Sequence, residues 1–387
     1  MAKLISILMS LIMFLFPWLN IPEANIDKDA FETNYTNVFV HGFAGWGEYD
    51  TLAYAAMPYW GINSGDLMKY LNARGFDCHA ASVSPTASAW DRACELYAQL
   101  TGTVTDYGEA HSEKCNHDRY GTDYSKNRLI DDWSSEEKVN LFGHSFGGAT
   151  VRILASLMAY GDETECKTSD DVSPLFEGGK GDWIYSVTTL SAPHNGTSSI
   201  AAAEVIQNDP DATTEERLIV KVLLGISEYD VNDRIKEDTA YYEMDIDNAL
   251  ALNEKIRTVP GVYYFSYATD GTKTDENGNR ATDETVLKSM YKTCADRICA
   301  YTGMTANGYK VDEKWRANDG LVNTYSALAP LGAPSTEFDE DNINPGIWNV
   351  MEVVTGSHTT LQGGVSDSFD GRTFFVSHIT MINTIEK

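Results

Sequence analysis

The chain has 387 residues, of which 43% are hydrophobic and 22% are charged, a composition typical of globular proteins with a hydrophobic core. Lys and Arg number 29 against 57 Asp and Glu, so the formal net charge is −28. Such an acidic surface repels phosphate backbones and anionic membranes, which argues against a nucleic-acid-binding protein.

The N-terminal residues have the features of an export signal. Lys3 gives a short positive start, and an apolar run of residues 4–19 precedes a candidate cleavage site near Ala24. We therefore expect residues 1–24 to be a signal peptide and the mature chain to be secreted, with an uncleaved anchor as the alternative. No later segment is apolar enough to cross a membrane, so we expect no stable membrane insertion of the mature chain.

Strands and helices alternate along the rest of the chain. This alternation predicts one α/β domain over residues 25–387, with a mostly parallel central sheet and helices on both faces. The polar residues 102–128 show little periodicity and are expected to form a long loop. A hairpin turn is expected at Asn277-Gly278. The expected strands are 35–40, 78–83, 139–142, 182–190 and 262–267, and the expected helices are 64–75 (capped by Ser64), 90–100, 149–160 and part of 200–224.

Six cysteines occur in the chain, an even number that permits disulfides in an exported protein. Their spacing contains no Cys-x-x-Cys zinc pattern, and both free buried thiols and bridges remain open. They are Cys78, Cys94, Cys115, Cys166, Cys294 and Cys299.

The sequence GHSFG at residues 143–147 fits the Gly-x-Ser-x-Gly pattern of a nucleophile elbow. A short apolar strand precedes Ser145 and a helical pattern follows it, as this sharp turn requires. The turn places the serine at a helix N-terminus, where N–H groups stabilise negative charge. We therefore predict that Ser145 is a nucleophile.

A serine nucleophile needs a histidine base and an orienting carboxylate, which follow it in this fold in the order Ser, acid, His. Of the three histidines after Ser145, His194 comes too early and His378 lies in an apolar run typical of a core helix. His358 follows an apolar stretch in a loop, so it is the predicted base.

Asp319 lies in an Asn-Asp-Gly turn before this base, and chain order favours it as the acid, although such turns are common in any fold. The oxyanion hole needs two backbone N–H groups, one after the nucleophile and one from the loop after the first strand. Phe146 and Phe43 are at these positions, the latter within the glycine-rich residues 41–47.

Several longer motifs occur in order along residues 38–325: HGF and GWG within 41–47, WDRACE at 90–95, YAQL at 97–100, SPLFEGG at 173–179 and NDGLVNT at 318–324. With these motifs the chain resembles the thermoalkalophilic, zinc-containing bacterial true lipases and related polyester-cleaving lipases of anaerobes. The resemblance implies the α/β-hydrolase fold and assigns the triad to Ser145, Asp319 and His358.

The resemblance also implies a structural zinc ion, which the spacing alone would not indicate. The matching ligands are Asp91, His111, His117 and Asp238, and carboxylates with imidazoles suit four-coordinate zinc. We expect the zinc to hold an insertion around residues 91–128 against the core.

Three departures from the family pattern are visible. Family members often have Gln after the nucleophilic serine, where this chain has Phe146. The lid interval, around residues 197–237, is short and predicts a reduced lid. The residues after His358 lack the expected acid, so no calcium site is expected.

The predicted function is carboxylic-ester hydrolysis through an acyl-enzyme, on an ester or lipid substrate, with polyesters as a further substrate class. Two alternatives stay open. A non-catalytic binding module can reuse the same fold, and an acyltransferase or amidase uses the same three residues.

Overall fold

The computed structural model describes residues 31–62, 64–208, 210, 212–214, 217, 235–363 and 369–385. The expected signal peptide, residues 1–24, and much of the expected lid, residues 197–237, lie outside these ranges. Among the described residues, no helix combines the length and the apolar character needed to cross a membrane.

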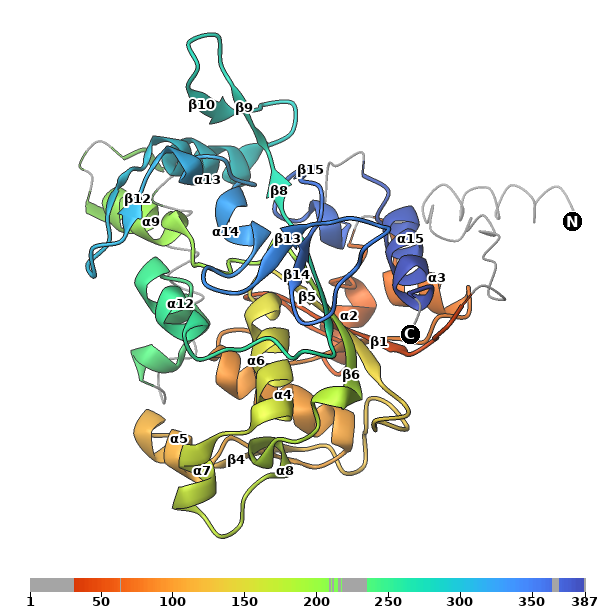
Figure 1. The fold of residues 1–387 in the computed structure, drawn as a ribbon. Helices are drawn as coiled ribbons and strands as arrows, with labels where there is room; N and C mark the ends of the chain where they lie inside the picture. The colour runs from red at the N-terminus through yellow and green to blue at the C-terminus, as the bar shows by residue number, and fades with distance from the viewer. Residues whose placement is uncertain are drawn as a thin grey trace, which may run out of the picture.

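A seven-stranded sheet forms the centre of the molecule (Figure 1). All neighbouring strands are parallel, in the order β13-β14-β7-β6-β5-β1-β2. This arrangement confirms the expected parallel α/β sheet. The strands are β1 (Thr36–Val40), β2 (Cys78–Ala81), β5 (Val139–His144), β6 (Ile184–Leu190), β7 (Tyr263–Tyr267), β13 (Ser335–Glu337) and β14 (Trp348–Val350).

Helices pack on both faces of this sheet, with α4, α6 and α8 on one face and α3 and α15 on the other. The helices of the described residues, apart from the short α5 given below, are α2 (Thr51–Ala56), α3 (Leu67–Asn72), α4 (Ala89–Thr101), α6 (Gly147–Tyr160), α7 (Glu163–Thr168), α8 (Pro174–Glu177), α9 (Ser198–Asn208), α11 (Ala240–Glu243), α12 (Ile246–Asn253), α13 (Ser289–Ala300), α14 (Thr324–Leu328) and α15 (Gly371–Asn383).

The two faces follow from the period-two alternation of strand side chains. Val38 and Leu141 point into one buried cluster with residues of α4, α6 and α8. Phe39 and Phe142, the next residues along the same strands, point into a second cluster with α3 and α15. The two phenyl rings stack with their centroids 4.5 Å apart. Because both faces are buried, β1 and β5 carry apolar side chains on both faces of the sheet.

Residues 102–128 correct one expectation, because they form regular structure rather than a long loop. They contain β3 (Val104–Asp106), α5 (Glu109–Cys115) and β4 (Tyr120–Asp123), with β3 and β4 antiparallel. Elements of three to seven residues are too short to show a periodic pattern. The expected cap of the helix near residue 67 is also wrong, since Asp66 rather than Ser64 accepts the N–H of Lys69.

The hairpin expected at Asn277-Gly278 is confirmed. It joins β9 (Thr272–Thr274) to β10 (Arg280–Thr282), which pair antiparallel and project from the top of the view in Figure 1. The remaining short strands are β8 (Thr269–Asp270) with β15 (Val354–Thr355), and β11 (Gly303–Met304) with β12 (Lys310–Val311). All six cysteines lie in the described residues and are free thiols, so the question of bridges is resolved.

Candidate active site and metal site

Ser145 lies at the carboxyl end of β5, in the turn that leads into α6. Its φ is +53°, a left-handed conformation that costs energy for a residue with a side chain. The turn needs glycine on either side. A Cβ on Gly143 would lie 2.4 Å from the carbonyl oxygen of Gly147, and a Cβ on Gly147 would lie 2.4 Å from that of Val40. This geometry accounts for the Gly-x-Ser-x-Gly spacing.

The structure brings Ser145, His358 and Asp319 together, although more than 200 residues separate the first two. The Oγ of Ser145 is 2.9 Å from Nε2 of His358, and Nδ1 of His358 is 2.9 Å from Oδ2 of Asp319. All three residues are buried. This is the hydrogen-bonded geometry of a serine nucleophile, its base and the base's orienting acid.

Asp319 is held as a charged carboxylate. Burial raises the pKa of a carboxyl, but His358, the N–H of Val322 and the hydroxyl of Thr269 outweigh it and lower the pKa of Asp319. The Thr269 hydroxyl donates to Oδ2 at 2.7 Å, and the N–H groups of Leu321 and Val322 donate to Oδ1. The Asn-Asp-Gly turn found in the sequence therefore supplies backbone N–H groups that stabilise the negative charge of Asp319.

The N–H of Phe43 belongs to the loop after β1, where Gly42 lies so close to Ser145 that an added Cβ would be 2.6 Å from Cβ of Ser145. The carbonyl of Gly42, in the same peptide group, accepts hydrogen bonds from the imidazole of His41 at 2.8 Å and from the N–H of Gly45 at 3.2 Å. In a trans peptide the N–H points opposite to the carbonyl. Fixing that oxygen therefore fixes the direction of the Phe43 N–H. Among the described residues, neither this N–H nor that of Phe146 donates to a protein acceptor.

Arg92 fixes the same loop from α4. Its fully buried guanidinium donates to the carbonyls of His41 and Ser84, and its Nε donates to the Thr150 hydroxyl at 2.9 Å. Thr150 lies in the first turn of α6, so the side chain of Arg92 links the loop after β1 to the helix that follows Ser145. Sequence reasoning missed this role of Arg92, because its contacts come from three separated segments.

A cavity of about 270 Å³ opens beside Ser145 and His358. Its lining is mainly apolar and aromatic, with hydroxyl groups at a few points. The lining side chains besides the triad include Phe43, Trp46, Tyr59, Thr197, Ser199, Ile200, Ala203, Tyr241, Met244, Tyr291, Leu321 and Val322. Such a cavity accommodates an apolar group next to the nucleophile.

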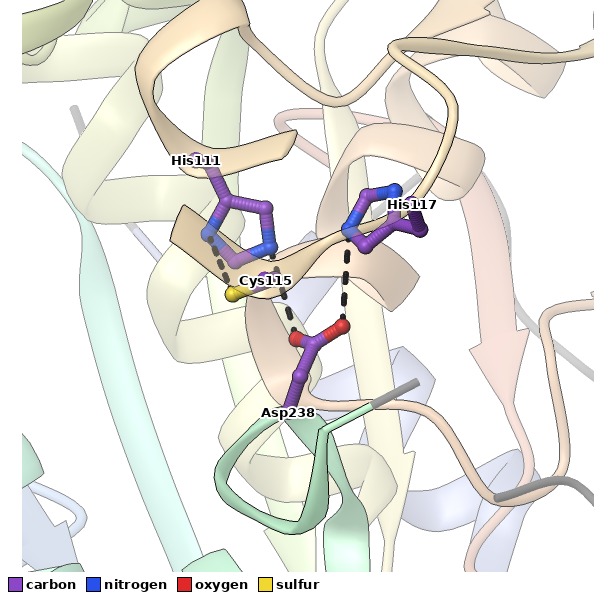
Figure 2. A group of neighbouring side chains, drawn as sticks. All are labelled: His111, Cys115, His117 and Asp238. Atoms are coloured by element: carbon purple, nitrogen blue, oxygen red, sulfur yellow. Dashed lines mark hydrogen bonds and ion pairs between the residues drawn. The ribbon is translucent and has the colours of Figure 1, made fainter. Parts of the chain in front are cut away.

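The four expected metal ligands meet at a second site, on the α4 side of the sheet. Asp91 lies in the first turn of α4, His111 in α5, and Asp238 in a 3-10 turn, η4 (Lys236–Asp238). Nε2 of His111 is 3.0 Å from a carboxylate oxygen of Asp91 and 3.3 Å from one of Asp238. Nε2 of His117 is 3.7 Å and 3.4 Å from the same two carboxylates. Figure 2 shows both imidazoles directed at Asp238.

Two contacts position these ligands from distant segments. The carboxylate of Glu165, in α7, accepts the N–H groups of Ala110 and His111 in the first turn of α5. The backbone at Thr239 forms a bridge with Ala87, which holds η4 against the start of α4. His111 and Asp238 are thus held in place by separate parts of the chain.

The chemistry of this site favours a cation. Burial lowers the pKa of His111, but hydrogen bonds to Asp238 and Asp91 outweigh it and raise its pKa to about 11. Nε2 of His117 is buried and makes no hydrogen bond within the described residues. Two carboxylates and two imidazole nitrogens around one point are a donor set that suits a divalent ion.

Cys115 lies beside the same site, and sequence reasoning did not single it out. It belongs to a group with His111, His117 and Asp238 whose candidate ligand atoms lie within 4.8 Å of one another. Its Sγ is 3.9 Å from Nδ1 of His111, whereas Nε2 of that ring faces the carboxylates (Figure 2). One ring cannot direct both nitrogens to one ion, so Asp91 fits the fourth position better than Cys115.

The two other histidines after Ser145, His194 and His378, are buried and hydrogen-bonded to core residues. His194 is buried between Arg152 and Thr189, and burial holds its pKa well below the usual value. His378 is buried in α15 and bonded to Thr188, as the apolar run around it indicated. Neither side chain is hydrogen-bonded to Ser145.

The chain matches the family model described as "Lipase-like, C-terminal domain" over residues 33–211 and 227–370. It is similar to a lipase of Staphylococcus hyicus, with 33% identity over 369 residues, which is 87% of this chain and 53% of that protein. The chain thus spans about half the length of the curated relatives it matches.

Solved structures are also similar to this chain, and the similarity covers nearly the whole length of both chains. EstA from Clostridium botulinum has a TM-score of 0.79 at 30% identity, covering 96% of this chain and 93% of that one. The Staphylococcus hyicus lipase structure has a TM-score of 0.74 at 28% identity, covering 93% and 98%. With the parallel sheet, these likenesses confirm the expected α/β-hydrolase fold.

Proposed function

The chain belongs to the lipase family whose model spans most of its length, and from that premise we propose that it hydrolyses carboxylic esters with Ser145 as nucleophile. One observation carries the proposal. The Ser145 hydroxyl, the His358 imidazole and the Asp319 carboxylate form an unbroken hydrogen-bonded series with 2.9 Å at each step.

The proposed reaction follows from these contacts. His358 accepts the hydroxyl proton through Nε2 as Ser145 Oγ attacks the ester carbonyl, and Asp319 stabilises the imidazolium. The N–H groups of Phe43 and Phe146 donate to the developing oxyanion. The tetrahedral intermediate expels the alcohol, which takes the proton from His358, and leaves an acyl group on Ser145. Water, deprotonated by His358, then releases the acid and restores the serine.

The cavity supports an apolar acyl or alcohol group as the part of the substrate bound beside Ser145. The net charge of −28 disfavours anionic lipid surfaces and is compatible with neutral esters. We therefore propose an ester or lipid substrate with an uncharged, apolar reacting end.

We also propose a structural zinc ion held by Asp91, His111, His117 and Asp238. Ligand atoms about 2.0–2.2 Å from a tetrahedral zinc lie roughly 3.4 Å apart. The separations between the imidazole and carboxylate atoms run from 3.0 to 3.7 Å, which supports this fit. When bound, the ion would neutralise the carboxylates and link α5, η4 and α4. It has no role in the reaction proposed above.

Secretion remains a proposal that rests on residues 1–24, whose positive start and apolar run have the order of an export signal. N-terminal sequencing of the protein recovered from culture medium tests it. A mature start after residue 24 supports secretion, and retention of the whole protein in the cells contradicts it.

The hydrolase proposal is tested with p-nitrophenyl esters of increasing acyl length, using the wild type and Ser145→Ala. We expect hydrolysis by the wild type and a loss of at least about 10³-fold in kcat for the variant. A variant with unchanged hydrolysis would remove Ser145 from the mechanism. An inactive wild type that does not react with a fluorophosphonate would favour a binding module instead.

A further inference from the structure

A buried chain of hydrogen bonds joins the oxyanion loop to the catalytic histidine. The N–H of Gly42 is 3.0 Å from the hydroxyl of Tyr59, and this hydroxyl is 2.6 Å from Nδ1 of His144. Nε2 of the same imidazole is 2.8 Å from the carbonyl oxygen of His358. Tyr59 and His144 are 6% and 1% exposed, so water does not compete for these bonds.

Each hydrogen bond in this series has only one possible donor and one possible acceptor. A backbone N–H can only donate and a carbonyl can only accept. Burial lowers the pKa of His144 to about 3, so the ring is neutral and carries one proton. That proton must be on Nε2, facing the His358 carbonyl, which makes Nδ1 an acceptor. The Tyr59 hydroxyl therefore donates to Nδ1 and accepts from Gly42.

We propose that Tyr59 and His144 are positioning residues that hold the general base and the oxyanion loop at one fixed separation. This role rests on the ester hydrolysis proposed above. It gives a purpose to the histidine of the GHSFG motif and to Tyr59, neither of which touches the reacting atoms through these bonds.

The backbone of His358 is fixed on both sides by this arrangement. Its N–H donates to the carbonyl of Asp319 at 2.8 Å, and its carbonyl accepts from His144. A second tie runs parallel to the first, since the N–H of Gly61 donates to the carbonyl of Gln362 at 2.7 Å. The segment that follows Tyr59 is thus bonded to the segment that follows the base.

The other end of this series of hydrogen bonds, at Gly42, lies beside the proposed oxyanion hole. Gly42 immediately precedes Phe43, whose N–H is the proposed oxyanion donor, and it lies against Ser145. The base and the oxyanion donors act on the same tetrahedral centre, so a relative shift of a few tenths of an ångström weakens both. Such a shift slows the chemical step more than it weakens substrate binding.

The structure offers a matched control for loss of a buried tyrosine hydroxyl. Tyr267 is bonded to Nδ1 of His378 at 2.9 Å, and Nε2 of that ring is 2.8 Å from the hydroxyl of Thr188. This second tyrosine–histidine pair is buried between β7, β6 and α15, and within the described residues neither side chain is hydrogen-bonded to Ser145, His358 or Asp319. Tyr→Phe at either position removes one hydroxyl and keeps the ring.

The test compares Tyr59→Phe with Tyr267→Phe in the full chain, using p-nitrophenyl butyrate and thermal unfolding. Both variants are expected to lower the melting temperature. Only Tyr59→Phe is expected to lower kcat, by about 10-fold with KM within about twofold, because the aromatic wall of the cavity is retained. Its reaction with a fluorophosphonate should slow to a similar extent.

A conservative replacement gives a second measurement. In His144→Gln the amide can donate to the His358 carbonyl and accept from Tyr59, whereas His144→Leu can do neither. We expect His144→Gln to retain at least about fivefold more kcat than His144→Leu. If His144→Leu does not fold, the comparison of the two tyrosine variants still decides.

Two results would overturn the positioning role: a wild-type kcat in folded Tyr59→Phe, or equal losses of kcat in Tyr59→Phe and Tyr267→Phe. An inactive wild-type protein would instead remove the hydrolase function itself. An active wild type with an unaffected Tyr59→Phe removes only the role of this hydrogen-bond chain.

Discussion

The contact between Gly42 and the nucleophile allows a test with a single added methyl group. A Cβ on Gly42 would lie 2.6 Å from Cβ of Ser145, 3.0 Å from the carbonyl oxygen of His144 and 3.1 Å from Oγ of Ser145. Ordinary van der Waals contact begins near 3.4 Å. In Gly42→Ala the oxyanion loop and the serine must therefore separate by close to 1 Å.

The expected cost has two parts. Overpacking of a well-packed site destabilises a protein by about 1–3 kcal/mol. A displacement of about 1 Å between reacting groups can lower the rate by about 10²-fold. We expect Gly42→Ala to fold, to melt at a lower temperature and to lose about 10²-fold in kcat on p-nitrophenyl butyrate.

Gly261→Ala is the matched control for this change. A Cβ at Gly261 would meet nothing within 4 Å, and the residue is not among the glycines with positive φ. Its kcat and melting temperature should stay near the wild-type values. A folded Gly42→Ala with wild-type kcat would show that the loop after β1 is not held against the nucleophile, and would refute this account of the oxyanion hole.

Three further predictions follow from the two sites. Asp319→Asn keeps the shape of the acid but removes its charge, and should lower kcat by about 10⁴-fold while leaving fluorescence-monitored folding intact; a small loss would contradict its role. The lowered pKa of Asp319 stabilises the folded protein at pH values above about 3.9, the pKa of this carboxyl in the unfolded chain. This stabilisation is lost as pH falls through the lower pKa of the folded state. Thr269→Val removes one hydrogen bond to this carboxylate and should raise its pKa. The free energy of unfolding, measured as a function of pH, should then begin to fall at a higher pH than in the wild type, and an unchanged pH dependence would contradict this. His117→Ala should abolish binding of one zinc per chain and lower the melting temperature, whereas Cys115→Ser should retain the metal; the reverse pattern would assign the fourth ligand to Cys115.

The elements that could be predicted from sequence are those whose pattern is local. The turn at Ser145 forces glycines two residues before and after it, and the long strands and helices carry periodic apolar residues. The order of residues along the chain then favoured Asp319 as the acid and His358 as the base. The structure places His358 beside Ser145 and Asp319 beside His358.

The features that sequence did not reveal depend on contacts between distant segments. The short elements within 102–128 are held by ion pairs rather than by an apolar stripe: Arg119 bonds Asp106 at 2.9 Å and Glu109 at 3.1 Å. Likewise, Tyr59 acts on His358 across 299 positions through His144, and no spacing rule relates them. Such contacts leave no periodic signal.

The most direct test of the central claim is the site at which a fluorophosphonate reacts. The wild-type protein should acquire one phosphonyl group, which peptide mass spectrometry should locate on Ser145, and prior substitution of His358 by Ala should slow its formation by at least about 10³-fold. An unmodified protein, or an adduct on any other residue, would contradict the assignment of Ser145 as a nucleophile activated by His358.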